Sequence, residues 1–137
     1  MELTKSYLTD LVYKVNGAAI EVHKALGPGL LESVYHKCLK HELDLRRISY
    51  QSELVIPINY KGIELDAELR VDLLVEGVLP VELKATEGFH PIHEAIIMSY
   101  MKLLEKPEGL LINFNVTNLF KEGQKTFVNE QYRKLPD

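Results

Sequence analysis

The sequence is short of several features, and each shortage excludes a class of protein. Cys38 is the only cysteine among 137 residues, so neither an intrachain disulfide nor a cysteine-rich zinc site can form. No apolar run reaches the roughly 18 residues that a membrane span needs. Acidic residues outnumber basic ones by 20 to 16, which argues mildly against binding nucleic acid chiefly through a basic surface. We therefore expect a cytoplasmic protein without membrane contact.

What is present is the composition of an ordinary globular domain. Apolar residues make up 46% of the chain and charged residues 26%, without low-complexity segments or internal repeats. A chain of 137 residues can bury one core without disulfide or metal staples. We expect a single domain spanning residues 1–137.

Two helices are predicted at the start of the chain. From Leu8 the apolar residues recur at the three-four spacing of an amphipathic helix, and the segment Gly27-Pro28-Gly29 ends it. A second helix is predicted from about Leu30 to Leu45. Its expected inward side consists of Leu31, Val34, Tyr35, Cys38 and Leu39.

The rest of the chain predicts a mixed sheet. The segment after the second helix predicts a meander of three antiparallel strands. It consists of a strand over Leu54–Tyr60, a Lys61-Gly62 turn, a strand from Ile63 through Asp72, and the hairpin partner of that strand. Pro91 suits the first turn of a helix that ends near Leu104. The strand Gly109–Val116 reads as covered on both faces and parallel to the strand that ends at Lys84. The chain is expected to finish with an edge strand near Lys125–Asn129 and a polar tail, residues 130–137. The order is therefore α-α-β-β-β-α-β-β, which predicts an α/β fold with a mixed sheet flanked by helices.

The hairpin over Arg70–Lys84 carries the most informative pattern. Its apolar residues alternate on both strands, and they share one face only if the connecting loop has an odd number of residues. A three-residue loop, Val75-Glu76-Gly77, meets this condition and pairs Leu74 with Val78. The face opposite the core then carries Arg70, Asp72, Glu82 and Lys84.

Two readings of that charged face follow from the residues alone. Neighbouring carboxylates under a covering helix are costly, and a divalent cation between Asp72 and Glu82 would compensate them. The alternative is an exposed Glu–Lys strand face at the solvent side of the sheet. In this register Arg70 lies opposite Glu82, which predicts a cross-strand ion pair first and a phosphate contact second.

The motifs together resemble a known family. Asp72 followed by Glu82-Leu83-Lys84 resembles the PD-(D/E)XK nuclease superfamily, and Gly29-Leu-Leu-Glu32-Ser-Val-Tyr35 is similar to the signature of its GxxExxY protein family. The stretches Pro91–Ala95, Ser99–Leu103 and Gly109–Val116 also look like that family's blocks, in the same order. The resemblance covers nearly the whole chain and implies a restriction-endonuclease-like core.

The resemblance implies a metal-dependent nuclease that hydrolyses nucleic acid, with DNA as the expected substrate. Asp72 and Glu82 would bind Mg²⁺ or Mn²⁺, with Glu32 joining as a ligand or through a water. Lys84 would orient the attacking water or stabilise charge at phosphorus. The implied catalytic set is therefore Glu32, Asp72, Glu82 and Lys84.

Several neighbours are candidates for supporting roles, and one departs from the family pattern. Tyr35 is expected to pack in the core, whereas Arg70, His93 and Tyr100 are expected near the carboxylates. The family usually has a glutamine four residues before this tyrosine, but Ile96 occupies that position here, where it is expected to belong to the apolar stripe of its helix with Ile92, Ala95 and Leu103. Either the glutamine is dispensable, or the chain is a weakened or inactive nuclease that serves as a binding or regulatory module.

Two further alternatives concern zinc and self-association. The order His90-Pro91-Ile92-His93-Glu94 matches neither zinc-protease helix motif, so His90 is expected to cap the helix and His93 to lie near the carboxylates. A homodimer formed through the long first helix is also open, because the sequence does not decide the oligomeric state.

Overall fold

The computed structural model describes residues 2–65 and 69–137, and its helices and strands follow the predicted order with additions. The helices are α1 (Lys5–Leu26), α2 (Glu32–Leu45), α3 (Pro91–Leu104), α4 (Leu119–Glu122) and α5 (Glu130–Arg133). The strands are β1 (Tyr50–Val55), β2 (Ile58–Tyr60), β3 (Ile63–Leu65), β4 (Arg70–Val75), β5 (Leu79–Lys84), β6 (Glu108–Asn113) and β7 (Gln124–Val128). α4 was not predicted, and α5 lies in the stretch expected to be a polar tail.

Five strands form one mixed sheet in the order β1-β4-β5-β6-β7. β6 pairs in parallel with β5, as predicted from the intervening helix, and the other neighbours are antiparallel. Every residue of β6 is buried, which confirms that both of its faces are covered. β6 is shorter than predicted, since it ends at Asn113 rather than Val116.

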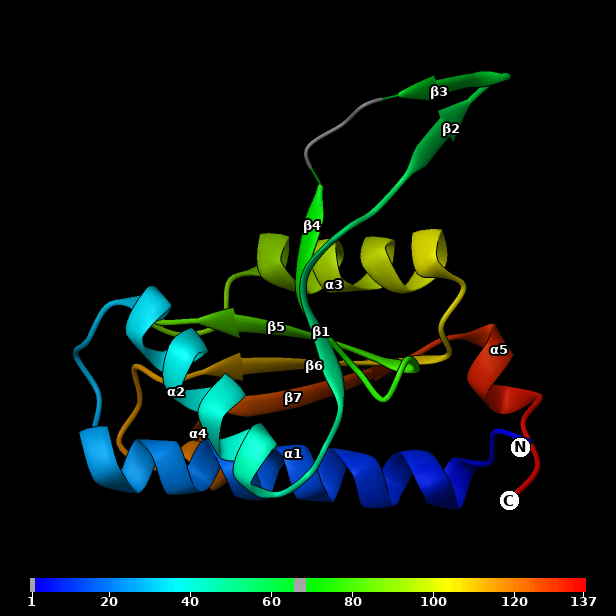
Figure 1. Ribbon diagram of the computed structural model, residues 1–137. Coiled ribbons are helices and arrows are strands. Elements are labelled where there is room, and N and C mark those ends of the chain that lie inside the picture. The colour runs from blue at the N-terminus through cyan, green and yellow to red at the C-terminus, as the bar shows by residue number, and fades with distance from the viewer. Residues whose placement is uncertain (1, 66–68) are drawn as a thin grey trace.

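Helices cover the two faces of the sheet (Figure 1). α1 and α2 lie on one face, where the buried stripe of α1 meets the inward residues of β4, β5 and β6. That stripe is Leu8, Leu11, Val15, Ala18, Ala19 and Val22. α2 begins at Glu32 rather than Leu30, and Leu31 is exposed instead of inward, because it precedes the first helical turn.

α3 covers the other face, but not with the predicted side. Its fully buried residues are Ile97 and Met101, whereas Ile92, Ala95 and Leu103 of the predicted stripe are exposed and Ile96 is half-buried. Gly109 on β6 explains the choice, because a Cβ there would lie 2.9 Å from both Ile97 Cγ1 and Met101 Sδ. The missing side chain lets the helix approach the strand closely.

The hairpin of β4 and β5 has an odd loop, as predicted, but in a different register. Val75 pairs with Leu79 and Leu73 with Val81, so the three-residue loop is Glu76-Gly77-Val78 and the predicted pairing of Leu74 with Val78 is wrong. The alternation of faces survives, because both loops have three residues. The apolar set therefore still faces α1 and α2.

The predicted three-stranded meander is interrupted. β1 ends at Val55, and β2 and β3 form a separate two-stranded sheet that projects away from the body (Figure 1). We call these two strands, residues 58–65, the arm. Part of the predicted strand from Ile63 to Asp72 lies outside the described residues, and the chain re-enters the main sheet at Arg70.

Candidate metal centre

Asp72 and Glu82 lie across from each other where the β4–β5 ladder ends. The pairing of Leu73 with Val81 places them in the next opposed position. The Leu83 N–H donates to Asp72 Oδ2 at 2.8 Å, and the Asp72 N–H donates to Glu82 Oε1 at 3.2 Å. Each carboxyl group is thus anchored by a backbone N–H of the opposite strand, which holds the two side chains beside each other.

Glu82 is the buried member of this pair, with 5% of its surface exposed. Burial raises its pKa to about 9, and the charge of Asp72 and a side-chain hydrogen bond with Asp72 act in the same direction. Lys84 opposes the rise. Without a cation the pair therefore holds a proton at neutral pH, which is the expected state of two adjacent carboxyl groups in a dry site.

Glu32 and Lys84 approach the pair from two further positions. Glu32 is the first residue of α2, and Lys84, half-buried, is the last residue of β5. The surrounding protein raises the pKa of Glu32, Asp72 raises it further and Lys84 lowers it. The charges of Asp72 and Lys84 thus reach Glu32, but Glu32 is exposed and does not close with Asp72 and Glu82 into a group of three acids.

Tyr35 lies in the core, as predicted, and its hydroxyl shapes the loop before α2. The ring stacks on Phe114 with centroids 4.5 Å apart. The hydroxyl donates to the Gly27 carbonyl at 2.6 Å and accepts from the Leu30 N–H at 3.1 Å. Because Glu32 follows directly, this tyrosine positions the start of α2 rather than taking part in chemistry.

We expect Tyr35→Phe to lower the free energy of unfolding by about 1 kcal/mol, because it leaves two partly buried backbone groups, the Gly27 carbonyl and the Leu30 N–H, without their partner. Urea denaturation measures the change. Tyr13→Phe is the matched control, since Tyr13 is 78% exposed on α1 and should have no effect. Equal stability of the two variants would show that the hydroxyl does not hold the loop.

α3 contributes residues to the covering wall of the site. Burial raises the pKa of Tyr100, and the charges of Glu82 and Asp72 add to it. Burial, Lys84 and His90 lower the pKa of His93, whose buried Nδ1 has no hydrogen-bond partner among the described residues. Tyr100 thus lies within range of the charges of Glu82 and Asp72, and His93 within range of Lys84.

The other polar residues at the start of α3 do not join the centre. His90 occupies the N-cap position, but its side chain makes no capping hydrogen bond. Its ring lies edge-on to that of His93, with centroids 5.2 Å apart. Glu94 binds Lys125 Nζ at 2.9 Å and so faces β7 instead.

The predicted ion pair between Arg70 and Glu82 is wrong. The register shift places Asp72, not Arg70, opposite Glu82, and Arg70 opposite Val55 on the other neighbour, β1. Arg70 is exposed. A phosphate contact is the remaining expectation for it.

Two residues near the centre were missed by the sequence analysis. Asn113, fully buried at the end of β6, bonds the backbone of Thr86 and Gly88 and so holds the loop after Lys84. An asparagine in a strand expected to be covered on both faces was the signal for it. Glu53 is an exposed residue of β1 between the pairs Ser52–Leu73 and Leu54–Val71, with a φ of 52° that is strained for a non-glycine residue.

Within residues 2–65 and 69–137, no group of three or more His, Cys, Asp or Glu side chains lies ready to hold a metal ion. A pair of carboxylates still suits Mg²⁺ or Mn²⁺, because such ions keep several waters and need only one or two protein carboxylates. The raised pKa of Glu82, caused by burial and by the charge of Asp72, marks the same need for positive charge. The donor set therefore fits a hard divalent cation.

Comparison with known proteins agrees with this geometry. The sequence model of the PD-(D/E)XK nuclease superfamily matches residues 9–127. The chain belongs to the PD-(D/E)XK nuclease superfamily. No curated protein and no solved structure gave a significant match. The mixed five-stranded sheet flanked by helices agrees with the restriction-endonuclease-like fold of this superfamily.

Membership in the superfamily supports a nuclease-type function and a nucleic-acid substrate. PD-(D/E)XK nucleases generally use divalent metals. The matched span includes β4, β5, α2 and α3, the elements that carry the candidate centre. None of the helices within the described residues has the length and apolarity needed to span a bilayer.

Proposed function

We propose that this PD-(D/E)XK domain is a metal-dependent phosphodiesterase that hydrolyses nucleic acid, with DNA as the expected substrate. The observation that carries the proposal is the pair formed by Asp72 and Glu82, which lie opposite each other at the end of the β4–β5 ladder and are each held by a backbone N–H of the other strand. Lys84 beside it supplies the ammonium group that the superfamily motif requires. We also assign residues 1–137 to one such domain, and the finer GxxExxY membership and the cytoplasmic location remain predictions.

Asp72 and Glu82 would hold Mg²⁺ or Mn²⁺, with Glu32 as a further ligand or a partner through water. When bound, such a cation polarises the phosphodiester and lowers the pKa of water to supply a nucleophile. Glu82 must first release its proton, since only the carboxylate is a ligand. The N–H of Leu83 keeps Asp72 turned toward Glu82 while this occurs.

Lys84 acts directly on the substrate in this proposal. Its ammonium group, whose charge lowers the pKa of Glu82 against the effect of burial, would orient the attacking water and stabilise negative charge that develops on the phosphate oxygens. His93 lies within range of the Lys84 charge, which lowers the pKa of its imidazole, and its buried Nδ1 has no hydrogen-bond partner within the described residues. Tyr100 and α3 would exclude bulk water from the covered side.

Incubation of the purified chain with single- and double-stranded DNA and RNA tests the proposal. We expect cleavage with Mg²⁺ or Mn²⁺, none with EDTA, and a loss of about a hundredfold or more in Lys84→Ala. Lys121→Ala, an exposed lysine on α4, is the matched control and should cleave normally. Equal cleavage by all three proteins would point to a contaminating nuclease and remove the support.

One observation favours the second candidate, a nuclease fold that binds or regulates without catalysis. Ile96 is half-buried on α3, at the position where the family usually has a glutamine. Isoleucine cannot complete a hydrogen-bond network there. Failure of the wild type to cleave any of the four substrates, combined with cleavage by Ile96→Gln, would establish this candidate.

A further inference from the structure

α3 covers only part of the sheet face that carries Asp72 and Glu82. The helix packs on β5 and β6, whose residues are all buried except Lys84. β4 and β1 lie beyond β5 in the strand order. Arg70 projects from the same face as Asp72, and its partner Val55 on β1 projects with it. Arg70 is exposed and Val55 is 50% exposed, so this part of the face is open to solvent.

An ion pair fixes how α3 is rotated above the sheet. Glu94 binds Lys125 Nζ of β7 at 2.9 Å, so this side of the helix faces the β7 edge. Because each residue turns an α-helix by about 100°, positions 92, 96 and 103 lie about 160–200° around the axis from Glu94. They therefore face away from β7, toward the side of the sheet where β4 and β1 lie. We call Ile92, Ile96 and Leu103 the open flank of α3.

The open flank is apolar and accessible. Ile92 is 62% exposed, Leu103 is 38% exposed and Ile96 is half-buried. The next side chain toward the sheet is that of Tyr100, whose pKa is raised by burial and then by the charges of the two paired carboxyl groups. The flank thus borders the candidate metal centre. A row of exposed apolar side chains beside such a centre indicates a surface that a ligand covers.

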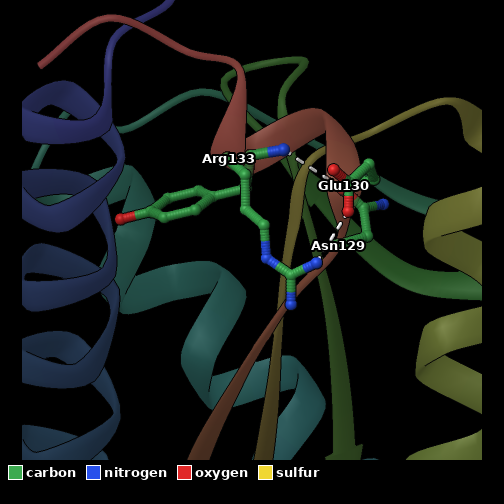
Figure 2. A network of polar contacts seen from close by, with 4 residues as sticks. Asn129, Glu130 and Arg133 are labelled. Carbon is green, nitrogen blue, oxygen red and sulfur yellow. Dashed lines mark hydrogen bonds and ion pairs between the residues drawn. The ribbon is translucent and has the colours of Figure 1, made fainter.

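The opposite flank of α3 has a different character. Met98 is the one apolar side chain among the described residues that line a cavity of about 500 Å³ between α3 and α5. Lys102, Glu105 and Glu130 place charges of both signs around it. Arg133 Nη1 binds Glu130 at 2.6 Å, which holds part of that rim within α5 (Figure 2). This flank therefore offers an isolated methionine, whereas the open flank offers a row of three apolar side chains.

The charges near the open flank favour a ligand that is recognised by its apolar surface. Arg70 lies beside Asp72 on β4, and Lys84 lies beside Glu82 on β5, so cations do not exceed acids there. A duplex presents its phosphates outward and keeps its base faces stacked inside, and holding it through phosphates requires an excess of cations. A single strand also exposes base faces, which pack on protein side chains whatever the sequence. Unpaired bases therefore match this surface better than a duplex does.

We propose that unpaired bases of single-stranded nucleic acid lie on the open flank of α3 while an adjacent phosphodiester reaches Asp72 and Glu82. A single strand is then the preferred substrate, and the preference is independent of base sequence, because apolar side chains do not read the polar edges of bases. In this arrangement Ile96 supplies apolar surface at the position where the family usually has a glutamine. The cleavage part of this inference rests on the proposed function, whereas the binding of bases depends neither on a metal nor on catalysis.

Fluorescence anisotropy in EDTA tests the binding of bases without cleavage. The probes are a labelled oligothymidylate, an abasic strand with the same number of phosphates, and a duplex. We expect the oligothymidylate to bind about tenfold more tightly than either of the other probes, because only it exposes base faces. Equal affinity for the oligothymidylate and the abasic strand would show that phosphates alone are bound, and this result overturns the inference.

Leu103→Ser and Met98→Ser form a matched pair on α3, because the two side chains are 38% and 37% exposed. Leu103→Ser and Ile92→Ser should each weaken binding of the oligothymidylate by about fivefold and leave binding of the abasic strand unchanged. Met98→Ser, on the opposite flank, should bind like the wild type. Equal losses in all three variants, or no loss in Leu103→Ser and Ile92→Ser, would overturn the assignment of the open flank. Circular dichroism checks that each variant is folded.

Cleavage assays separate this inference from the proposed function. We expect single-stranded DNA to be cleaved in preference to duplex DNA, and Leu103→Ser to raise the KM for the single strand by about fivefold with kcat unchanged. Cleavage that favours the duplex would overturn the inference and leave the nuclease proposal standing. A chain that binds the oligothymidylate as expected but cleaves no substrate supports the base-binding flank and overturns the proposed function instead.

Discussion

Asp72→Asn is expected to abolish metal-dependent cleavage, with a loss on the order of a thousandfold or more. A bound metal ion would stabilise the transition state by several kcal/mol. That stabilisation is lost when one of the two carboxylates proposed to hold the ion loses its charge. The asparagine oxygen can still accept from the Leu83 N–H, so the β4–β5 hairpin should keep its register. The loss is therefore one of charge rather than of fold.

Calorimetric titration with Mn²⁺ gives the direct readout for this variant. Binding should be detected in the wild type and be lost in Asp72→Asn. Glu108→Gln is the control, because Glu108 is also buried and burial also raises its pKa, but it starts β6, about 17 Å from the end that carries Asn113. Mn²⁺ binding that survives in Asp72→Asn would remove this residue from the centre.

Glu82→Gln is expected to stabilise the metal-free protein at alkaline pH. The pKa of Glu82 is raised from 4.5 in the unfolded chain to about 9 in the fold, so the folded state holds a proton that the unfolded state releases between these values. The free energy of unfolding must then fall as pH rises through this window, by up to about 1 kcal/mol per pH unit. Glutamine stays neutral and removes this contribution.

Chemical denaturation in EDTA at several pH values between 5 and 9 measures the effect. The wild type should lose stability toward pH 9, and Glu82→Gln should lose much less. Glu108→Gln should keep most of the decline, although the raised pKa of Glu108 acts in the same direction. A wild-type free energy of unfolding that is constant or rises with pH would contradict the raised pKa of Glu82.

Cation binding should convert Glu82 from its protonated form to the carboxylate. Because the carboxylate is the ligand, Mn²⁺ binding at pH 7 should release close to one proton and tighten by up to tenfold per pH unit below about 9. Titrations in buffers of different ionisation enthalpy count the proton. Tight binding without proton release would place the ion elsewhere.

The sequence predicted which face of the sheet carries Asp72 and Glu82, but it did not predict the register in which β4 pairs with β5. Two-residue periodicity decides which side chains share a face, and any odd loop satisfies it. Moving the loop from Val75–Gly77 to Glu76–Val78 preserves the faces and replaces Arg70 by Asp72 opposite Glu82. Tertiary structure thus turned an expected ion pair into a pair of carboxyl groups.

α3 shows a similar limit. It is apolar on almost every side, so its sequence does not select the buried stripe, and the close approach over Gly109 selects Ile97 and Met101. The same choice leaves Met98 and Leu103 partly exposed. The side of α3 that stays exposed therefore depends on a contact between segments distant in the chain.

The sequence alone determined the α/β class, the parallel crossover into β6 and the common face of Asp72 and Glu82, because periodicity and chain connectivity are local properties. Only the tertiary structure decided which strand residues oppose each other, where the arm leaves the sheet and how strongly Glu82 is buried. These depend on packing between remote segments. That packing sets the local dielectric, and with it the raised pKa of Glu82.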